Sequence, residues 1–419
     1  MLKFTKFLVM LEKENRIILI NKNVGSWIKI SKESYQIIFQ VIEKNLPKAQ
    51  LLNAFKNNDD RQYFKQLLDV LKKRKILVPK NDSKDTNVED ISIDFTNRCN
   101  LNCIHCMAEA NEDKGKKELD TSKYKLLIDK ILSVSPDSIT ISGGEPMVRS
   151  DFNELCNYIR VSYTGNLSLM TNGTLISEEN VDLLVRNFNN ISISLDGIDE
   201  ESSSILRGNE AFTRAMNGIQ LLKKRGFSKI SASMVETKIN VHLIPKFIEM
   251  CKRMNVYPMI RAFAAVGRGE KSKEQLLIRP DYCPDANLLE EYLSAPIENF
   301  ETHSISGVCS SSINSFYIDA YGNIFPCAPL SSPEYLYDNI NNIANFKNYI
   351  NKREYKKTSG YLTFSSDFPE NNEMCSSCEV NTFCWHCIFQ HNQKRLNDSN
   401  FKTWCNLQKK ELDTIWYEE

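Results

Sequence analysis

The sequence lacks the two patterns that would direct it to a membrane or out of the cell. No apolar run reaches about 18 residues, the length that a transmembrane helix requires. The N-terminus has no signal-peptide pattern, because Met1–Met10 is followed at once by Glu12, Lys13 and Glu14. The sequence therefore predicts a cytoplasmic protein.

Cysteine is absent from residues 1–88, although the whole chain holds 13 cysteines. Negative charge is scarce in the same segment, which has eighteen Lys and Arg against nine Asp and Glu, whereas the full chain has 53 of each kind. An excess of positive charge confined to one segment indicates an acidic partner for that segment. Residues 1–88 therefore differ in kind from the rest of the chain.

Residues 1–88 show three apolar runs followed by three runs with helical periodicity. The predicted strands are Phe7–Leu11, Arg16–Ile20 and Ser26–Ile30, and the predicted helices are Glu33–Glu43, Pro47–Phe55 and Asp59–Lys73. This order resembles the winged-helix recognition domain found on maturases of ribosomally made peptides. The resemblance implies that the leader of a precursor peptide adds a strand to the sheet edge and packs against the third helix.

Nucleic acid is the alternative partner of this segment. Winged helices also bind DNA, and the basic run from Lys72 to Lys75 is able to contact phosphates. The cysteine motifs in the rest of the chain favour a peptide over nucleic acid, because function follows the site and not the fold.

Three cysteines follow a short predicted strand at a spacing that suits an iron–sulfur cluster. Cys99, Cys103 and Cys106 form Cys-x3-Cys-x2-Cys directly after the apolar run Ile91–Phe95. Three thiolates on one loop can hold three irons of a [4Fe–4S] cube and leave the fourth iron open. A Cys-x2-Cys pair alone is more often half of a zinc site or a redox pair, so the triplet needs support from elsewhere in the chain.

That support comes from the segment SITISGGEP at residues 138–146. Gly143 and Gly144 allow the backbone to approach a ligand closely, Glu145 supplies a carboxylate, and Pro146 ends the strand. The cysteine loop followed by Gly-Gly-Glu-Pro resembles the radical S-adenosylmethionine (SAM) superfamily. The resemblance implies that this segment receives the SAM ammonium and that His105, just before the third cysteine, lies near the adenine.

Beyond this segment, predicted strands alternate with predicted helices. The strands are Leu167–Met170, Ile191–Leu195, Ile230–Met234 and Met259–Ala264, and the helices are Glu178–Phe188, Ala211–Lys224 and Leu243–Met254. Such alternation predicts an α/β fold of parallel strands with crossover helices. The resemblance implies a partial (β/α)6 TIM-like barrel, in which ligands bind at the C-terminal ends of the strands.

Polar residues at those strand ends are the candidate SAM contacts. By the resemblance, Ser194 and Asp196 hydrogen-bond the ribose, and Asn172 lines the same cleft. Arg207 pairs with the SAM carboxylate through its forked guanidinium, and the backbone of residues 264–267 borders the adenine. The alternative is that these residues are turn formers or solvated charges.

Seven more cysteines and one glycine lie near the C-terminus in a second pattern. They are Cys309, Gly322, Cys327, Cys375, Cys378, Cys384, Cys387 and Cys405. The pattern resembles the SPASM extension of radical SAM enzymes, except that two residues and not three separate Cys384 from Cys387. Thiolates at this density, in a chain without a secretory signal, indicate metal and not disulfides.

The SPASM resemblance implies two auxiliary [4Fe–4S] clusters. Cys375, Cys378, Cys384 and Cys405 would hold one of them. Cys309, Cys327 and Cys387 would hold the other, with His303, Cys283 or an open position as the fourth ligand. Two zinc sites are the alternative. Cys156 and Cys251 lie in helical patterns and are expected to be buried small hydrophobic residues.

We therefore expect four segments. Residues 1–88 form the winged-helix domain, 89–270 the barrel, 271–308 a bridging segment and 309–419 the SPASM domain. The resemblance implies that a 5′-deoxyadenosyl radical takes hydrogen from a precursor peptide, with an external donor such as flavodoxin or ferredoxin supplying electrons. A cysteine thioether is the expected product. No catalytic residue is assigned beyond the cluster and SAM site.

Three alternatives remain open at this point. A SPASM maturase could form a carbon–carbon crosslink on the same scaffold. An anaerobic sulfatase maturase would make formylglycine, although its family places an aspartate where this chain has Ala328, directly after Cys327. An iron–sulfur or zinc regulator that reads DNA would perform no catalysis.

Overall fold

The computed structural model describes residues 2–22, 26–80, 88–111, 115, 117–278, 309–378, 381, 387–395, 401–402, 405–406 and 409. Cys283, His303 and Cys384 therefore lie outside the described residues. The chain divides into two compact units, each of which is described by itself. The smaller unit comprises Met1–Asp85, Ser294–Ile313 and Ser366–Glu419, and the larger unit comprises Thr86–Leu293 and Asn314–Ser365. No helix in the described part of the chain has the length and apolar character needed to cross a bilayer.

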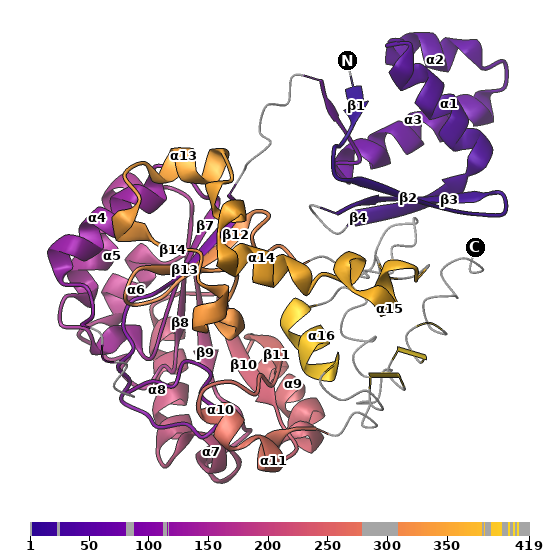
Figure 1. The fold of residues 1–419 in the computed structure, drawn as a ribbon. Helices are drawn as coiled ribbons and strands as arrows, with labels where there is room; N and C mark the ends of the chain where they lie inside the picture. The colour runs from indigo at the N-terminus through magenta and orange to yellow at the C-terminus, as the bar shows by residue number, and fades with distance from the viewer. Residues whose placement is uncertain are drawn as a thin grey trace. The chain divides into compact units, whose positions relative to one another are not determined.

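The N-terminal part of the smaller unit has the predicted order of three strands followed by three helices (Figure 1). The antiparallel sheet β2-β3-β4 is formed by Leu8–Lys13, Arg16–Asn21 and Ser26–Ser31, and the helices are α1 (Lys32–Glu43), α2 (Lys48–Ala54) and α3 (Asn58–Lys73). A second sheet, β1 (Leu2–Phe4) with β5 (Leu77–Pro79), was not predicted. Each of these two strands has only three residues, which is too short to show an alternating pattern in the sequence.

Capping and apolar burial explain these helices. The side chain of Ser31 accepts a hydrogen bond from the Ser34 N–H at the start of α1, and that of Asn57 accepts one from Asp59 at the start of α3. Both helices direct one apolar stripe inward, where Ile38 and Leu71 are fully buried.

The larger unit is built on a sheet in which six parallel strands follow one another in chain order. They are β6 (Asp90–Asp94), β7 (Ser138–Ser142), β8 (Asn166–Thr171), β9 (Asn190–Ser194), β10 (Ile230–Glu236) and β11 (Tyr257–Ala262). The helices between and after them are α4 (Thr121–Leu132), α5 (Phe152–Ser162), α6 (Val181–Asn187), α7 (Glu200–Arg207), α8 (Ala211–Lys224), α9 (Ile244–Arg253), α10 (Arg268–Lys271) and α11 (Lys273–Leu276). The α/β class and the strand–helix alternation predicted from the sequence are confirmed.

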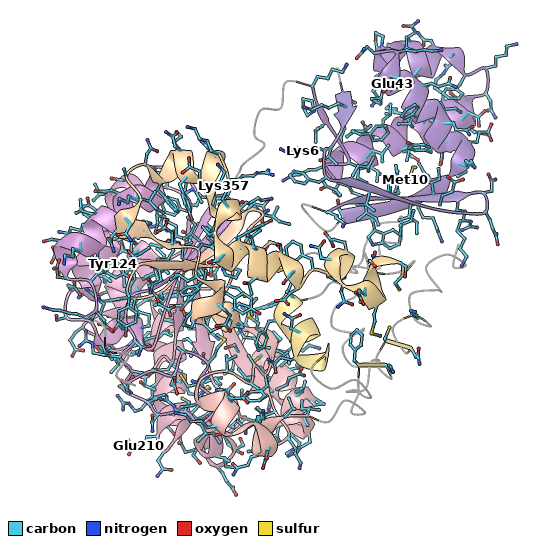
Figure 2. All side chains as sticks on the ribbon, in the orientation of Figure 1. Lys6, Met10, Glu43, Tyr124, Glu210 and Lys357 are labelled. Carbon is cyan, nitrogen blue, oxygen red and sulfur yellow. The ribbon has the colours of Figure 1, made fainter. Side chains whose placement is uncertain are left out.

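The two faces of this sheet differ in polarity. Successive side chains of a strand point to opposite faces. One face carries the paired residues Ile91, Ile139 and Leu167, all of them buried, and the other carries the paired residues Thr140 and Ser168. Figure 1 shows the helices of this unit around the outside of the strands, so the apolar face packs against helices and the polar face is turned inward. Tyr124 of α4 is fully buried in this packing (Figure 2).

The C-terminal half of the chain extends the same sheet. β12 (Ser315–Ile318) pairs in parallel with β6, and β13 (Asn323–Phe325) and β14 (Asp338–Asn339) continue in antiparallel fashion. The hydroxyl of Tyr317 also donates to the Asp94 carboxylate. The remaining helices are α13 (Phe346–Asn351), α14 (Ser359–Ser366), α15 (Glu373–Ser376) and α16 (Ile388–Arg395). Residues 309–419, expected as one segment, thus contribute to both compact units.

Candidate cluster and SAM site

The cysteine loop begins where β6 ends, and Glu118 fixes its first residues. One carboxylate oxygen of Glu118 accepts hydrogen bonds from the Thr96 hydroxyl at 2.7 Å and the Asn97 N–H at 2.6 Å. The other accepts from Arg98 Nε at 3.3 Å. Three consecutive residues ahead of Cys99 are therefore held by one carboxylate.

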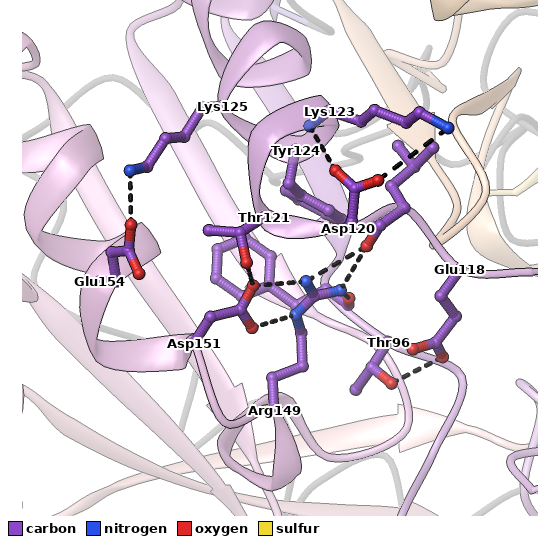
Figure 3. A network of polar contacts seen from close by, with 12 residues as sticks. Thr96, Glu118, Asp120, Thr121, Lys123, Tyr124, Lys125, Arg149, Asp151 and Glu154 are labelled. Atoms are coloured by element: carbon purple, nitrogen blue, oxygen red, sulfur yellow. Dashed lines mark hydrogen bonds and ion pairs between the residues drawn. The ribbon is translucent and has the colours of Figure 1, made fainter.

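A buried ion pair supports the strand end behind this loop (Figure 3). Arg149 grips Asp151 with two hydrogen bonds of 2.8 and 2.7 Å and donates to the Phe95 carbonyl at 2.9 Å. The Thr121 hydroxyl adds a bond of 2.6 Å to the same carboxylate. Arg149 holds the pKa of Asp151 down at about 2, well below its usual range. The network stabilises the end of β6 and does not itself reach the cysteines.

Gly143 and Gly144 let the next strand end approach the cysteine loop. The N–H groups of Gly144 and Glu145 donate to the carbonyls of Thr96 and Arg98, each at 2.8 Å. A Cβ atom on Gly144 would lie 2.2 Å from the Arg98 oxygen, and one on Gly143 would lie 2.4 Å from the Thr96 oxygen. The close approach that the sequence predicts toward a ligand is thus made, in this structure, toward the backbone of the cysteine loop.

Backbone and side-chain contacts also fix the middle of the loop. Asn111 accepts a hydrogen bond from the Cys99 N–H at 2.7 Å and donates to the Leu101 carbonyl at 3.4 Å. The Ile104 N–H donates to the Leu206 carbonyl at 3.0 Å, which ties the loop to the end of α7. The loop conformation is therefore set by the protein.

The three thiols of the loop are free, and two of them are electrostatically disfavoured as thiolates. Burial raises the pKa of Cys99 to about 11 and raises that of Cys103 as well. The charges of Arg207 and Arg268 oppose the rise at Cys103. Because a ligating cysteine must be deprotonated, occupation of this loop by a metal would release protons, and the two arginines favour that release.

Asn172 lies beside the first cysteine. Its amide Nδ2 donates to Cys99 Sγ at 3.8 Å and to Asn100 Oδ1 at 2.9 Å. The Thr174 N–H and hydroxyl donate to its other amide atom, Oδ1, at 2.9 and 2.7 Å. The side chain of Asn172 is therefore turned to the cysteine loop, and its contact with SAM stays a prediction.

Glu145 is fully buried and holds three hydrogen bonds. Its carboxylate accepts from the Thr171 hydroxyl at 2.8 Å, the Asn172 N–H at 2.7 Å and the Met147 N–H at 3.2 Å. Burial raises the pKa of Glu145, although the hydrogen bonds oppose that rise. The carboxylate therefore joins β7 to the end of β8 in addition to any contact with a ligand.

Asp196 brings together two other predicted site residues. Its Oδ2 lies 2.6 Å from Arg207 Nη2 and 2.9 Å from His105 Nε2, while its Oδ1 accepts from the Val235 N–H at 2.6 Å. Burial alone would raise the pKa of Asp196, but Arg207 and His105 outweigh it and hold that pKa below its usual range. The resemblance assigned these three residues to different parts of SAM, whereas the structure pairs them with one another. Ser194 lies nearby on β9 and accepts a long hydrogen bond of 3.4 Å from Ser233.

The donor set around the loop fits an anionic, acceptor-rich group. Among the described residues, His105 Nδ1, Arg207 Nε and Arg268 Nη2 are buried donors or acceptors without a hydrogen-bond partner. Buried polar atoms of this kind are normally paired. No three His, Cys, Asp or Glu side chains in the described ranges converge closely enough for a single metal ion. A four-iron cube spaces its thiolates more widely than one ion does, so three free thiols on one loop suit a [4Fe–4S] cluster.

The described C-terminal cysteines are divided between the two compact units. Cys309 belongs to the smaller unit and Cys327 to the larger one. In the smaller unit, Cys375 lies on α15, and the Cys378 N–H donates to its carbonyl at 3.0 Å. The side chains of Cys387 and Cys405 are partly exposed. Their assignment to two clusters stays a prediction.

Comparison with known sequences identifies the domain. Residues 93–251 match the sequence profile of the Radical SAM superfamily. This chain contains a radical SAM domain. Enzymes of this superfamily use a [4Fe–4S] cluster and SAM, so the cofactors predicted for the domain are confirmed at the level of the family.

Three relatives extend the radical SAM domain match. Mycofactocin maturase MftC of Mycolicibacterium smegmatis is 32% identical over 177 residues, which is 42% of this chain and 45% of the relative. MftC of Mycobacterium tuberculosis is 27% identical over 301 residues, 68% of this chain and 74% of the relative. An AdoMet-dependent heme synthase of Nitratidesulfovibrio vulgaris is 26% identical over 329 residues, 71% and 86% of the two chains. The chain thus spans about half the length of the first relative.

Three solved structures of two proteins share the fold. SuiB of Streptococcus suis bound to S-adenosylmethionine has a TM-score of 0.55 at 17% identity, covering 93% of this chain and 96% of SuiB. SuiB bound to its precursor peptide SuiA has a TM-score of 0.53. AdoMet-bound anSMEcpe has a TM-score of 0.52 at 18% identity, covering 78% of this chain and 98% of that protein.

Sequence reasoning missed the residues that hold the radical SAM loop from outside its motif. Glu118 and Asn111 lie after the last cysteine, and Arg268 lies beyond β11. Asn111 adopts a left-handed backbone conformation with φ of 72°, for which asparagine is one of the few suitable residues. Nothing in the motif spacing pointed to these three contacts.

Proposed function

We propose that this protein uses radical SAM chemistry to oxidise a ribosomally made precursor peptide. When bound at Cys99, Cys103 and Cys106, the cluster supplies the electron that splits SAM and so makes hydrogen abstraction from the peptide possible. The residues of the chain bind and orient the two reactants and exclude water. We further propose that the new bond is a cysteine thioether.

The observation that carries this proposal is the extent of the SuiB likeness. It covers 93% of this chain and therefore includes residues well outside the radical SAM domain. SuiB itself has been solved with a precursor peptide. In this chain the additional residues include the basic N-terminal segment, which we propose is a winged-helix domain that binds the leader.

The N-terminal sheet offers backbone edges for such binding. Within the described residues, β2 and β4 are the end strands of the three-stranded sheet, each paired only with β3. An added peptide strand would gain main-chain hydrogen bonds there, and neighbouring side chains would select its sequence.

For SAM, we propose that Arg207 and Asp196 act as a pair. The buried Asp196 orients the Arg207 guanidinium, whose Nε is buried and has no hydrogen-bond partner in the described structure. A SAM carboxylate at that position would complete a fork-like contact. His105, held by the same Asp196, would border the adenine, and Ser194 the ribose.

We also propose two auxiliary clusters in a SPASM domain, with the cysteine assignments given above, and an external electron donor such as flavodoxin or ferredoxin. The auxiliary clusters would accept the electron released as the substrate bond closes. Free thiols at Cys99, Cys103 and Cys106 suit a reducing compartment, which supports a cytoplasmic location.

Similarity to the radical SAM relatives does not by itself indicate that the substrate is a peptide, because a heme synthase matches 71% of this chain. An anSMEcpe-like formylglycine reaction is the second candidate, favoured by the shared fold over 78% of this chain. Ala328, where that family carries an aspartate, counts against it.

The test is anaerobic reconstitution followed by product analysis. Protein with dithionite and SAM should release 5′-deoxyadenosine, and co-expression with a short cysteine-containing peptide encoded beside the gene should remove two hydrogens per crosslink. Cys103→Ala should abolish both products, whereas Cys156→Ala, a buried cysteine on α5, should keep both. A formylglycine product would replace the thioether proposal, and no 5′-deoxyadenosine from the wild type would refute radical chemistry.

A further inference from the structure

Arg268 contacts the radical SAM loop at three backbone oxygens. Its own N–H donates to the Cys106 carbonyl at 3.0 Å and its Nε to the Cys103 carbonyl at 3.0 Å. Its Nη1 donates to the Ala110 carbonyl. Two of the three carbonyls belong to cysteines of the loop, and the third lies beyond the last cysteine.

Gly267 allows this contact. Its φ is 59°, and a Cβ atom there would lie 2.6 Å from the Met107 oxygen and 2.8 Å from the Cys106 oxygen. Residues 267–268 therefore pack closely against the second half of the cysteine loop. Any larger residue at 267 would push Arg268 away from its carbonyl partners.

The guanidinium also has a free donor and an electrostatic effect. Within the described residues, Arg268 Nη2 is buried without a hydrogen-bond partner. The hydrogen bond from Arg268 Nε to the Cys103 carbonyl places the positive charge of the guanidinium beside that cysteine. A charged donor left over beside three thiols indicates that it serves an anion held by them.

We propose that Arg268 is a positioning residue for the radical SAM cluster, which clamps the cysteine loop and favours the reduced cluster through its positive charge. Reduction adds one electron to a site that three thiolates already make negative, so a nearby cation stabilises the reduced form more than the oxidised form. This proposal rests on the proposed function only in requiring a [4Fe–4S] cluster at Cys99, Cys103 and Cys106.

Three full-length variants separate the charge from the clamp. Arg268→Met removes both the charge and the clamp, whereas Arg268→Lys keeps the charge but loses the forked guanidinium. Lys271→Met is the control, because it removes a cation from the same helix, where Lys271 pairs with Glu109 at 2.8 Å. Each is titrated anaerobically with dithionite and followed by electron paramagnetic resonance. The radical SAM cluster is the one whose signal changes when SAM is added.

The midpoint potential and the iron content then give the result. Arg268→Met should lower the equilibrium constant for reduction about tenfold, which is about 59 mV for one electron. Arg268→Lys should keep the potential of the wild type but retain less iron after gel filtration. Lys271→Met should match the wild type in both measurements.

Two results would overturn the inference. One is an Arg268→Met variant with full iron and an unchanged potential. The other is a lysine variant shifted as far as the methionine variant, since charge would then not matter. Should Arg268→Met hold no cluster, the potential of the cluster fraction in Arg268→Lys decides: an unchanged potential supports the charge effect, and one lowered by about 59 mV refutes it. A wild type without a SAM-sensitive signal would instead refute the proposed function.

Discussion

The two cysteine regions of this chain differ in how much of their geometry the protein provides. In the radical SAM loop, three cysteines lie within eight residues, and Glu118, Asn111, Leu206 and Arg268 hold the loop by hydrogen bonds. The seven cysteines of the second region extend from Cys309 to Cys405 and belong to two compact units.

A short loop can be organised before its ligand arrives, because its contacts are made by the surrounding strands and helices. Cysteines that lie far apart in the sequence lose more conformational entropy when they converge on one metal site. Metal binding must therefore provide much of the ordering in the second region. The comparison predicts a preformed radical SAM site and C-terminal sites that depend on metal.

The largest difference is expected for loss of one cysteine in each region. Cys106→Ser should reduce formation of 5′-deoxyadenosine from SAM and dithionite to background, at least about a hundredfold, because the first site loses a ligand. Cys378→Ser should keep most of this activity, because SAM is split at the first site. Chromatography of the nucleoside products measures both. Equal loss in the two variants would contradict the separation of the two regions.

Removal of iron should affect the two regions unequally. After anaerobic chelation, hydrogen exchange of peptides from residues 366–378 should accelerate about tenfold or more, because metal binding there supplies folding free energy. Peptides from residues 88–111 should change less. Mass spectrometry of deuterium uptake, with peptides of α8 as the internal control, makes the comparison. A greater change in 88–111 would invert our interpretation.

Asn111 tests how much the preformed loop contributes to cluster retention. Asn111→Gly keeps the left-handed backbone but removes both side-chain hydrogen bonds, and should cost about 1–2 kcal/mol of loop stability and about tenfold in iron retention. Asn111→Asp keeps the acceptor for the Cys99 N–H and should lose less. Iron and sulfide assays after dialysis against a chelator distinguish them. If the glycine variant retains iron like the wild type, the loop needs no such support.

The smallest effect concerns stability in acid, through the ion pair of Arg149 and Asp151. The pKa of Asp151 in the folded protein, about 2, lies below its usual value, so its contribution to stability is present above about pH 4 and is lost as the pH falls toward 2. Asp151→Asn should therefore lower the stability of the larger unit by about 2 kcal/mol at pH 7 and by about half as much at pH 3.

Circular dichroism melts at the two pH values measure this difference. Glu154→Gln, which breaks the exposed pair with Lys125, is the matched control and should leave the melting temperature unchanged. A penalty for Asp151→Asn that stays constant with pH would show that the ion pair is not its cause.

The sequence predicts those parts of the fold that are encoded locally. Strands β7 to β11 each carry an apolar face that repeats every second residue, and the spacing of Cys99, Cys103 and Cys106 is enough to predict the cysteine loop. The pairing of β12 with β6 was not predictable, because a four-residue strand carries little pattern and its partner lies more than two hundred residues earlier. The same holds for Arg268, whose contacts exist only once β11 has packed beside the loop. Asp196 and Arg207 were both predicted to contact SAM, but their mutual ion pair required the structure.

The addition of β12 to the edge of β6 has a practical consequence for anyone who wishes to shorten this protein. Cutting the chain after residue 278 would remove β12, the hydrogen-bonded neighbour of β6. The backbone amide and carbonyl groups at that edge of β6 would then be unpaired beside hydrophobic side chains. Such a fragment is expected to aggregate. The catalytic half and the tail should be expressed together, even when only the former is of interest.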